Sequence, residues 1–152
     1  MSRKKFRFTL ASILKLRKHE TEQKKQDLAK KLKDRKTQEQ EVSEARKNLA
    51  HISSKVQKKQ ALTVKFLKRQ EAYHYEARNA LQKASERLDD LILEEQQTRA
   101  DLIQKKSAEE ALQSLHDQEK ANHIRGIESA EDKQIEEQAL ENYRRKQLAH
   151  KK

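Results

Sequence analysis

Apolar side chains recur at seven-residue spacing along the first half of the chain, in two rows offset by three or four residues. One row is Leu14, Thr21, Leu28, Arg35, Val42, Leu49 and Val56, and the other is Leu10, Arg17, Lys24, Lys31, Gln38, Ala45 and Ile52. Such spacing, with charged residues on either side, is typical of a coiled coil. Because charges interrupt the rows between Arg17 and Gln38, we expect this coiled coil to be marginal and dynamic.

The second half carries a similar pair of rows, whose members are Leu81, Leu88, Glu95, Leu102 and Glu109, and Ala84, Leu91, Thr98, Lys105 and Leu112. Between the halves, polar residues in the window 51–63 weaken the seam, namely Ser53, Ser54, Lys55, Lys58, Lys59 and Gln60, and the next apolar residues fall out of the first register. A phase reset across a polar stretch favours a chain reversal. The pattern therefore predicts an all-α fold, a long two-helix antiparallel coiled-coil hairpin with a longer, overhanging C-terminal helix.

A parallel homodimeric rod is the alternative, in which one continuous helix would be about 220 Å long. In the hairpin reading, residues 1–152 form a single coiled-coil domain. We expect a first helix over 1–52, a turn over about 53–63, a second helix over 64–140 and a frayed basic tail over 141–152. A turn near residue 58 would place residue i opposite residue 116 − i, so that Leu14 lies near Leu102.

Residues after about 110 then have no partner within the chain, although they remain partly apolar. Their larger apolar members include Leu112, Leu115, Ile124, Ile127, Ile135, Leu140 and Tyr143. An apolar stripe without an internal partner indicates a binding site for another protein.

Composition excludes most other classes. Charged residues make up 40% of the chain and hydrophobic residues only 33%, with one Gly, no Pro, no Cys and no Trp. This is too little apolar material for a globular core of this length, so we expect neither an enzyme nor a cofactor.

His116, Glu119 and His123 share a helix face, but a lone exposed helix cannot bring together the ligands of a metal site, and no metal is expected. No apolar run is long enough for a transmembrane segment, which suggests a cytoplasmic protein.

The net charge of +11 is concentrated near the N-terminus. Residues 1–36 contain 14 Lys and Arg against 4 Asp and Glu, whereas residues 37–152 contain 22 against 21. A basic block of this kind can bind nucleic acid, an anionic membrane or an acidic protein. Nucleic acid is not favoured, because no helix-turn-helix, zinc spacing or aromatic platform accompanies the block. A basic, nucleic-acid-associated coiled coil is nevertheless kept as an alternative function.

The N-terminal pattern Phe8-x-Leu10-x-x-Ile13-Leu14-x-Leu16-Arg17-x-x-Glu20 resembles the opening of the FliJ proteins of bacterial flagellar type III export. The related YscO-type stalk proteins of virulence type III secretion share this opening and are a further alternative. The stretch Asp132-x-x-Ile135-Glu136-Glu137-x-Ala139 is similar to the closing pattern of the FliJ family.

The resemblance implies a non-enzymatic, stalk-like adaptor in the cytoplasm, peripherally associated with the inner-membrane export apparatus. Its two chain ends would bind the hexameric export ATPase, its middle would bind the cytoplasmic domain of the export gate membrane protein, and it would escort export chaperones. Carried over by position, the ATPase-binding residues are Phe6, Phe8, Leu10, Ile13, Leu14, Arg17, Ile135, Glu136, Glu137 and Ala139. The gate-binding residues are Phe66, Leu67, Tyr73 and Ala77, where Ala77 is smaller than the pattern suggests.

Overall fold

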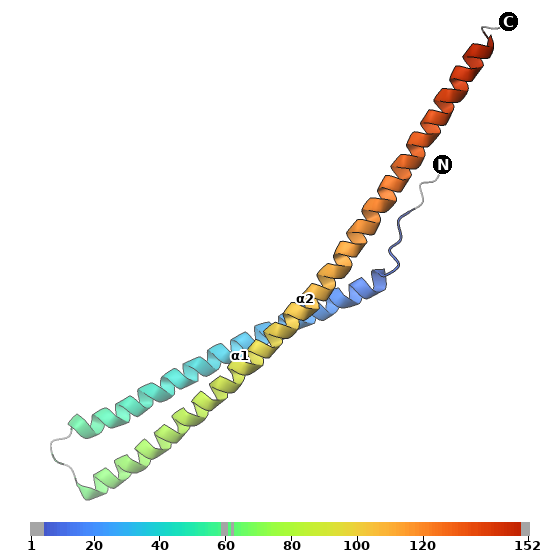
Figure 1. The fold of residues 1–152 in the computed structure, drawn as a ribbon. Helices are drawn as coiled ribbons and strands as arrows, with labels where there is room; N and C mark the ends of the chain where they lie inside the picture. The colour runs from blue at the N-terminus through green and yellow to red at the C-terminus, as the bar shows by residue number, and fades with distance from the viewer. Residues whose placement is uncertain (1–4, 59–60, 62, 150–152) are drawn as a thin grey trace. The chain divides into compact units, whose positions relative to one another are not determined.

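Two long α-helices, packed against each other, make up almost all of the described chain. The structure is a computed structural model that describes residues 5–58, 61 and 63–149. Helix α1 spans Ala11–Lys58 and helix α2 spans Val64–Ala149, and no β-strand occurs in these ranges (Figure 1). Both helices are rich in Lys, Glu, Gln, Ala and Leu, which are strong helix formers. The all-α prediction is confirmed.

Helix α1 ends later than the sequence indicated. It continues to Lys58, six residues past the expected end at Ile52. The hydroxyls of Ser53 and Ser54 donate to the backbone carbonyls of Leu49 and His51, at 3.0 and 2.9 Å. Because these hydroxyls are satisfied within the helix, the polar stretch that was expected to form a turn is helical through Lys58.

Helix α2 begins after a capping residue and continues to Ala149. The Thr63 hydroxyl accepts a hydrogen bond from the backbone N–H of Phe66 at 3.3 Å, in the manner of an N-cap. The expected end at residue 140 is passed, and residues 141–149 of the expected frayed tail are helical. Glu141 and Arg145 pair across one turn at 3.8 Å, and no Gly or Pro follows Gly126 to stop the helix. The last three tail residues, 150–152, lie outside the described residues.

The chain divides into two compact units, which are described separately. The central unit comprises residues 20–105, and the terminal unit comprises the described residues 5–19 and 106–149. In the central unit α1 and α2 run alongside each other (Figure 1) and bury a narrow seam of side chains. Its most buried side chains are Thr21, Val42, Ala77, Leu91 and Glu95. On α1, every central-unit member of the two predicted rows is buried or half-buried.

Ion pairs between the helices define the register of the central unit. Lys105 Nζ lies 3.1 Å from Glu20 Oε2, Lys24 Nζ lies 3.5 Å from Asp101 Oδ2, and Lys31 pairs with Glu94. The two residue numbers in each pair add to 125. The expected value of 116 is therefore wrong by nine, because α1 continues six residues past its expected end at Ile52 and α2 begins only at Val64.

A buried carboxylate lies in the middle of this seam. Glu95 is 4% exposed, and its oxygens accept hydrogen bonds from Arg35 at 2.8 Å and from Arg99 at 2.9 Å. The hydrogen bond from Arg35 is the main cause that lowers the pKa of Glu95. Gln38 donates to the carbonyl of Ala84 at 3.1 Å. Polar groups of this kind fix the register of a coiled coil while lowering its stability.

In the terminal unit the N-terminal segment packs on α2. Phe8 and Leu14 are buried, at 9% and 8% exposure. On α2 the half-buried positions continue at spacings of three or four residues, through His116, Glu119 and His123, and end at Ile127. Every residue from 128 to 149 is exposed. In the described range, Ile127 is therefore the last residue of α2 that is even half-buried.

Candidate protein-binding surfaces

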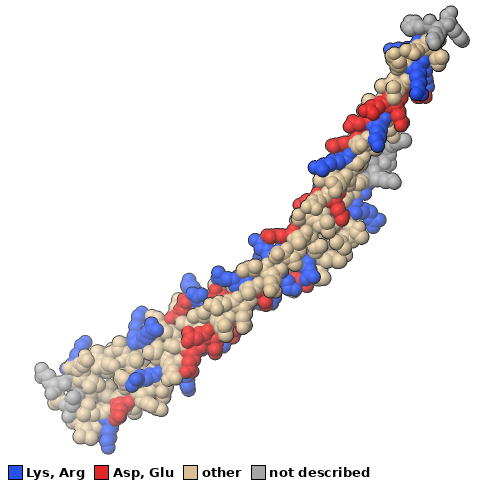
Figure 2. Space-filling view, viewed as in Figure 1, with Lys and Arg blue, Asp and Glu red and all other residues tan. Residues whose placement is uncertain are grey.

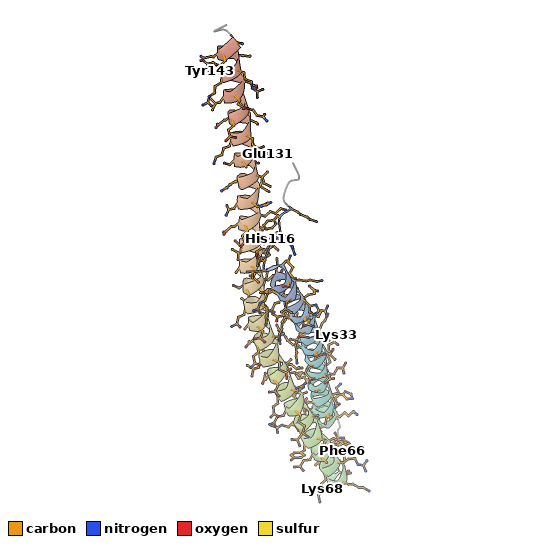
Figure 3. All side chains as sticks on the ribbon, turned by 90° about the vertical axis from the view of Figure 1, so that its right-hand side faces the viewer. Lys33, Phe66, Lys68, His116, Glu131 and Tyr143 are labelled. Atoms are coloured by element: carbon orange, nitrogen blue, oxygen red, sulfur yellow. The ribbon has the colours of Figure 1, made fainter. Side chains whose placement is uncertain are left out.

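Two phenylalanines of the N-terminal segment pack against two histidines of α2. The ring of Phe8 meets that of His116 edge-on, with centroids 5.1 Å apart and planes at 89°. Phe6 lies 5.5 Å from His116 and 5.6 Å from His123. Both distances are typical of favourable aromatic pairs. The cluster fixes the segment that precedes α1 against the part of α2 marked by His116 in Figure 3.

Basic and acidic groups border this cluster. Lys15 and Lys18 line an open hollow together with Phe6, Phe8, Ala11, Leu14 and His116. The Nδ1 atom of His116 lies 2.9 Å from Asp117 Oδ1. Hydrogen bonds from His116 and then Gln113 lower the pKa of Asp117.

The expected N-terminal ATPase-binding residues fall into two groups. Phe8 and Leu14 are buried, and Phe6, Leu10 and Arg17 are half-buried. Ile13 is 43% exposed, and Leu16, which was not among the expected binding residues, is 55% exposed. The buried Phe8 and Leu14 pack the N-terminal segment against the rest of the terminal unit, whereas Ile13 and Leu16 leave apolar surface exposed.

The end of α2 exposes several large apolar side chains. Ile124 is 46% exposed, and the exposed fractions rise to 58–69% farther along, at Ile135, Leu140, Tyr143 and Leu148. Figure 3 shows side chains projecting from all sides of α2 between Glu131 and Tyr143. Figure 2 shows basic and acidic side chains interspersed along this part of the helix.

Four of the apolar positions form one stripe. At about 100° per residue, Ile124, Ile135, Ala139 and Tyr143 fall within an arc of about 100°. The seam positions His116 and His123 lie on the roughly opposite side of the helix. On the seam side beyond Ile127 the side chains are mostly polar, namely Gln134, Glu137, Glu141 and Arg144. The outer stripe, as we call Ile124, Ile135, Ala139 and Tyr143, is therefore not a continuation of the packed seam.

The expected C-terminal ATPase-binding residues are all exposed. Ile135 and Ala139 belong to the outer stripe, and Glu136 lies beside it. Glu137 lies on the polar seam side, where it lines an open hollow with Gln138 and neighbouring residues. The structure therefore groups three of these four residues on or next to one surface.

The expected gate-binding residues lie near the start of α2, in the central unit. Leu67 and Tyr73 are 40% and 47% exposed, and Phe66 is half-buried. Ala77 is only 6% exposed and lies with Asn48 and Ile52 of α1 around one hollow. Ala77 is thus part of the seam, which explains its small size. Val64 and Tyr75, which are not among the expected gate-binding residues, are more exposed than any of them, at 70% and 68%.

Among residues 5–58, 61 and 63–149, no three His, Asp or Glu side chains are placed to hold a metal ion. Neither described helix has a stretch that is apolar enough to cross a bilayer. Comparison with protein-family models, curated proteins and solved structures gave no match. The family resemblance therefore stays a prediction.

Proposed function

We propose that this chain is a non-enzymatic, stalk-like adaptor of a flagellar type III export apparatus, similar to the FliJ proteins. In this proposal α1 and α2 form an antiparallel coiled-coil hairpin, and the end of α2 overhangs it. The two chain ends bind a hexameric export ATPase. The observation that supports this proposal most strongly is the outer stripe, which exposes apolar surface on a helix that has left its packed seam.

The stripe can supply substantial binding energy. Burying an Ile or Tyr side chain on binding is worth roughly 1.5–3 kcal/mol before ordering costs. Ile135 is 64% exposed and Tyr143 is 61% exposed, so a partner that covers both gains a few kcal/mol. An exposed apolar stripe with a polar border is also the usual form of a helix that docks in a groove of a partner.

The N-terminal segment offers a second contact in the same unit. Ile13 and Leu16 are exposed next to Lys15 and Lys18, which line the hollow beside the phenylalanines. Apolar side chains beside lysines suit an ATPase surface that combines apolar and acidic groups. The two ends of the chain would therefore contact the same ring.

The middle of the chain is proposed to contact the cytoplasmic domain of the export gate through Phe66, Leu67 and Tyr73. In this setting the protein is cytoplasmic, associates peripherally with the inner-membrane apparatus and escorts export chaperones. These roles follow from the family resemblance, and the exposure of Leu67 and Tyr73 is compatible with them.

The test is co-purification with the hexameric flagellar export ATPase. The double variant Ile135→Asp with Tyr143→Asp is expected to lose binding and to keep its helical content, because both side chains are exposed. The matched control is Leu140→Asp with Leu148→Asp, which adds the same charge on the same helix outside the outer stripe and should retain binding. Undiminished binding by the stripe variant, or equal loss by the control, would contradict the proposed surface. No binding by the unaltered chain would contradict the function itself.

A further inference from the structure

The end of the central unit that carries the connection between the helices has an unbalanced charge. Residues 45–70 include eight Lys and Arg and no Asp or Glu. Lys55 and Lys58 lie in the last turn of α1, and Lys65, Lys68 and Arg69 lie in the first turns of α2. In the described part of the chain none of these five forms an ion pair. By contrast, the seam lysines of the same unit face carboxylates on the opposite helix.

Exposed apolar side chains lie among these charges. Val64 is 70% exposed, Leu67 is 40% exposed and Tyr75 is 68% exposed. At about 100° per residue, Val64, Lys68 and Tyr75 fall within an arc of about 40° on the side of α2 away from the seam, and Lys65 lies next to this arc. Figure 3 labels Lys68 and Phe66 at this end of the helix. Two exposed carboxylates border the same side of α2: Glu71 lies next to Val64, between Lys68 and Tyr75 along the helix, and Glu76 lies near Lys65.

We propose that this loop-end surface, formed by Val64, Lys65, Leu67, Lys68 and Tyr75, docks on a bilayer that contains anionic phospholipids. The lysines supply the attraction to negative headgroups. Their aliphatic stems reach along the helix, so the ammonium groups stay at headgroup level while Val64 and Leu67 enter the boundary with the acyl chains. Tyr75 has the mixed character that favours this boundary.

The exposed aliphatic residues favour lipid over nucleic acid. A phosphate backbone would satisfy the lysines, but it offers nothing apolar to cover Val64 and Leu67. An anionic bilayer can pair with the lysines and also cover the aliphatic side chains at the same surface. The contact is peripheral, in agreement with the lack of a membrane-spanning stretch in the described helices. It is independent of the proposed binding to an ATPase, which uses the terminal unit, and it shares only Leu67 with the proposed contact to the export gate.

Sedimentation of the full chain with lipid vesicles tests this inference. Binding is expected to vesicles of phosphatidylcholine mixed with phosphatidylglycerol, and not to phosphatidylcholine alone. Each lysine charge removed should weaken binding roughly fivefold, so Lys65→Gln with Lys68→Gln should weaken it roughly 25-fold. The control Lys30→Gln with Lys33→Gln removes the same charge from exposed positions on α1 and should weaken binding by less than about threefold. Since the chain has no Trp, Tyr75→Trp introduces a single tryptophan whose emission, excited selectively, should shift to the blue on binding.

Four results would overturn the inference. The first two are equal binding to both kinds of vesicle and no binding to either. The third is a loss of binding in the Lys30→Gln, Lys33→Gln control that equals or exceeds the loss in Lys65→Gln, Lys68→Gln. The fourth is an unshifted emission of Tyr75→Trp in protein that sediments with the vesicles. Binding to a short DNA duplex without binding to anionic vesicles would assign the loop-end surface to nucleic acid instead. Circular dichroism of each variant verifies that helical content is unchanged.

Discussion

Leu91→Ala should destabilise the central unit strongly, because Leu91 is one of its few well-buried large apolar side chains. It is 4% exposed and belongs to a row that the sequence pattern already assigned to the seam. Replacing a buried Leu by Ala costs about 2–5 kcal/mol, depending on how far the surroundings close around the cavity. A seam only two helices wide can close readily, so we expect a loss of about 2–3 kcal/mol in the free energy of unfolding.

The matched control is Leu93→Ala, two residues away on the same helix. Leu93 is 55% exposed, so its removal should change the free energy of unfolding by less than about 1 kcal/mol. Both variants are compared with the unaltered chain by urea unfolding followed by far-UV circular dichroism. Equal losses in the two variants, or a larger loss for Leu93→Ala, would show that the seam does not run through Leu91 and would refute the register described here.

Three further outcomes are expected. The pKa values of Glu94 and Glu95 are held below their ordinary value of 4.5, chiefly by hydrogen bonds from Lys31 and Arg35. The two carboxylates therefore stabilise the fold fully above pH 4.5, and this stabilisation is lost as the pH falls below that value. Acid titration of helicity should show the loss, and Glu95→Gln should make the loss smaller. Phe8→Ala removes a ring that packs against α2, so trypsin should cut the N-terminal segment at least tenfold faster, since burying a Phe is worth about 1.5–3 kcal/mol. Gly126→Ala should stabilise α2 locally by up to about 1 kcal/mol, because a Cβ there meets nothing within 4 Å, and amide hydrogen exchange around residue 126 should slow accordingly.

The packed seam was largely predictable from the sequence, because seven-residue spacing depends on the side chains alone. Thr21 and Glu95 illustrate this, since both are polar and both lie at predicted row positions that the structure buries. The pattern identified their place in the row even though their chemistry is unusual for a core. Sequence spacing reports which face of a helix is covered, whatever residue occupies it.

The connection between the helices was harder to place. Ser53 and Ser54 looked like breakers, but their hydroxyls bond to carbonyls of the preceding turn. Whether a serine ends a helix depends on such bonds and on the opposite helix, and neither is visible in a local pattern. The same limitation produced the register error of nine positions.

The candidate surfaces were predictable only in part. Ile135 and Tyr143 were recognised as unpartnered apolar residues, and the structure exposes both. Ala77 was expected on the surface, but contacts with α1 bury it. The packing of His116 and His123 against Phe6 was missed, because nothing in the sequence indicates which distant rings meet.

Hydrogen–deuterium exchange on a mixture of the chain with the export ATPase hexamer tests the central claim most directly. The proposal predicts that the ATPase slows exchange in two stretches, 124–143 on α2 and the neighbourhood of Ile13 and Leu16, while residues 20–105 keep the exchange rates of the free chain. Unchanged exchange over 124–143 in a chain that is bound to the ATPase would contradict it.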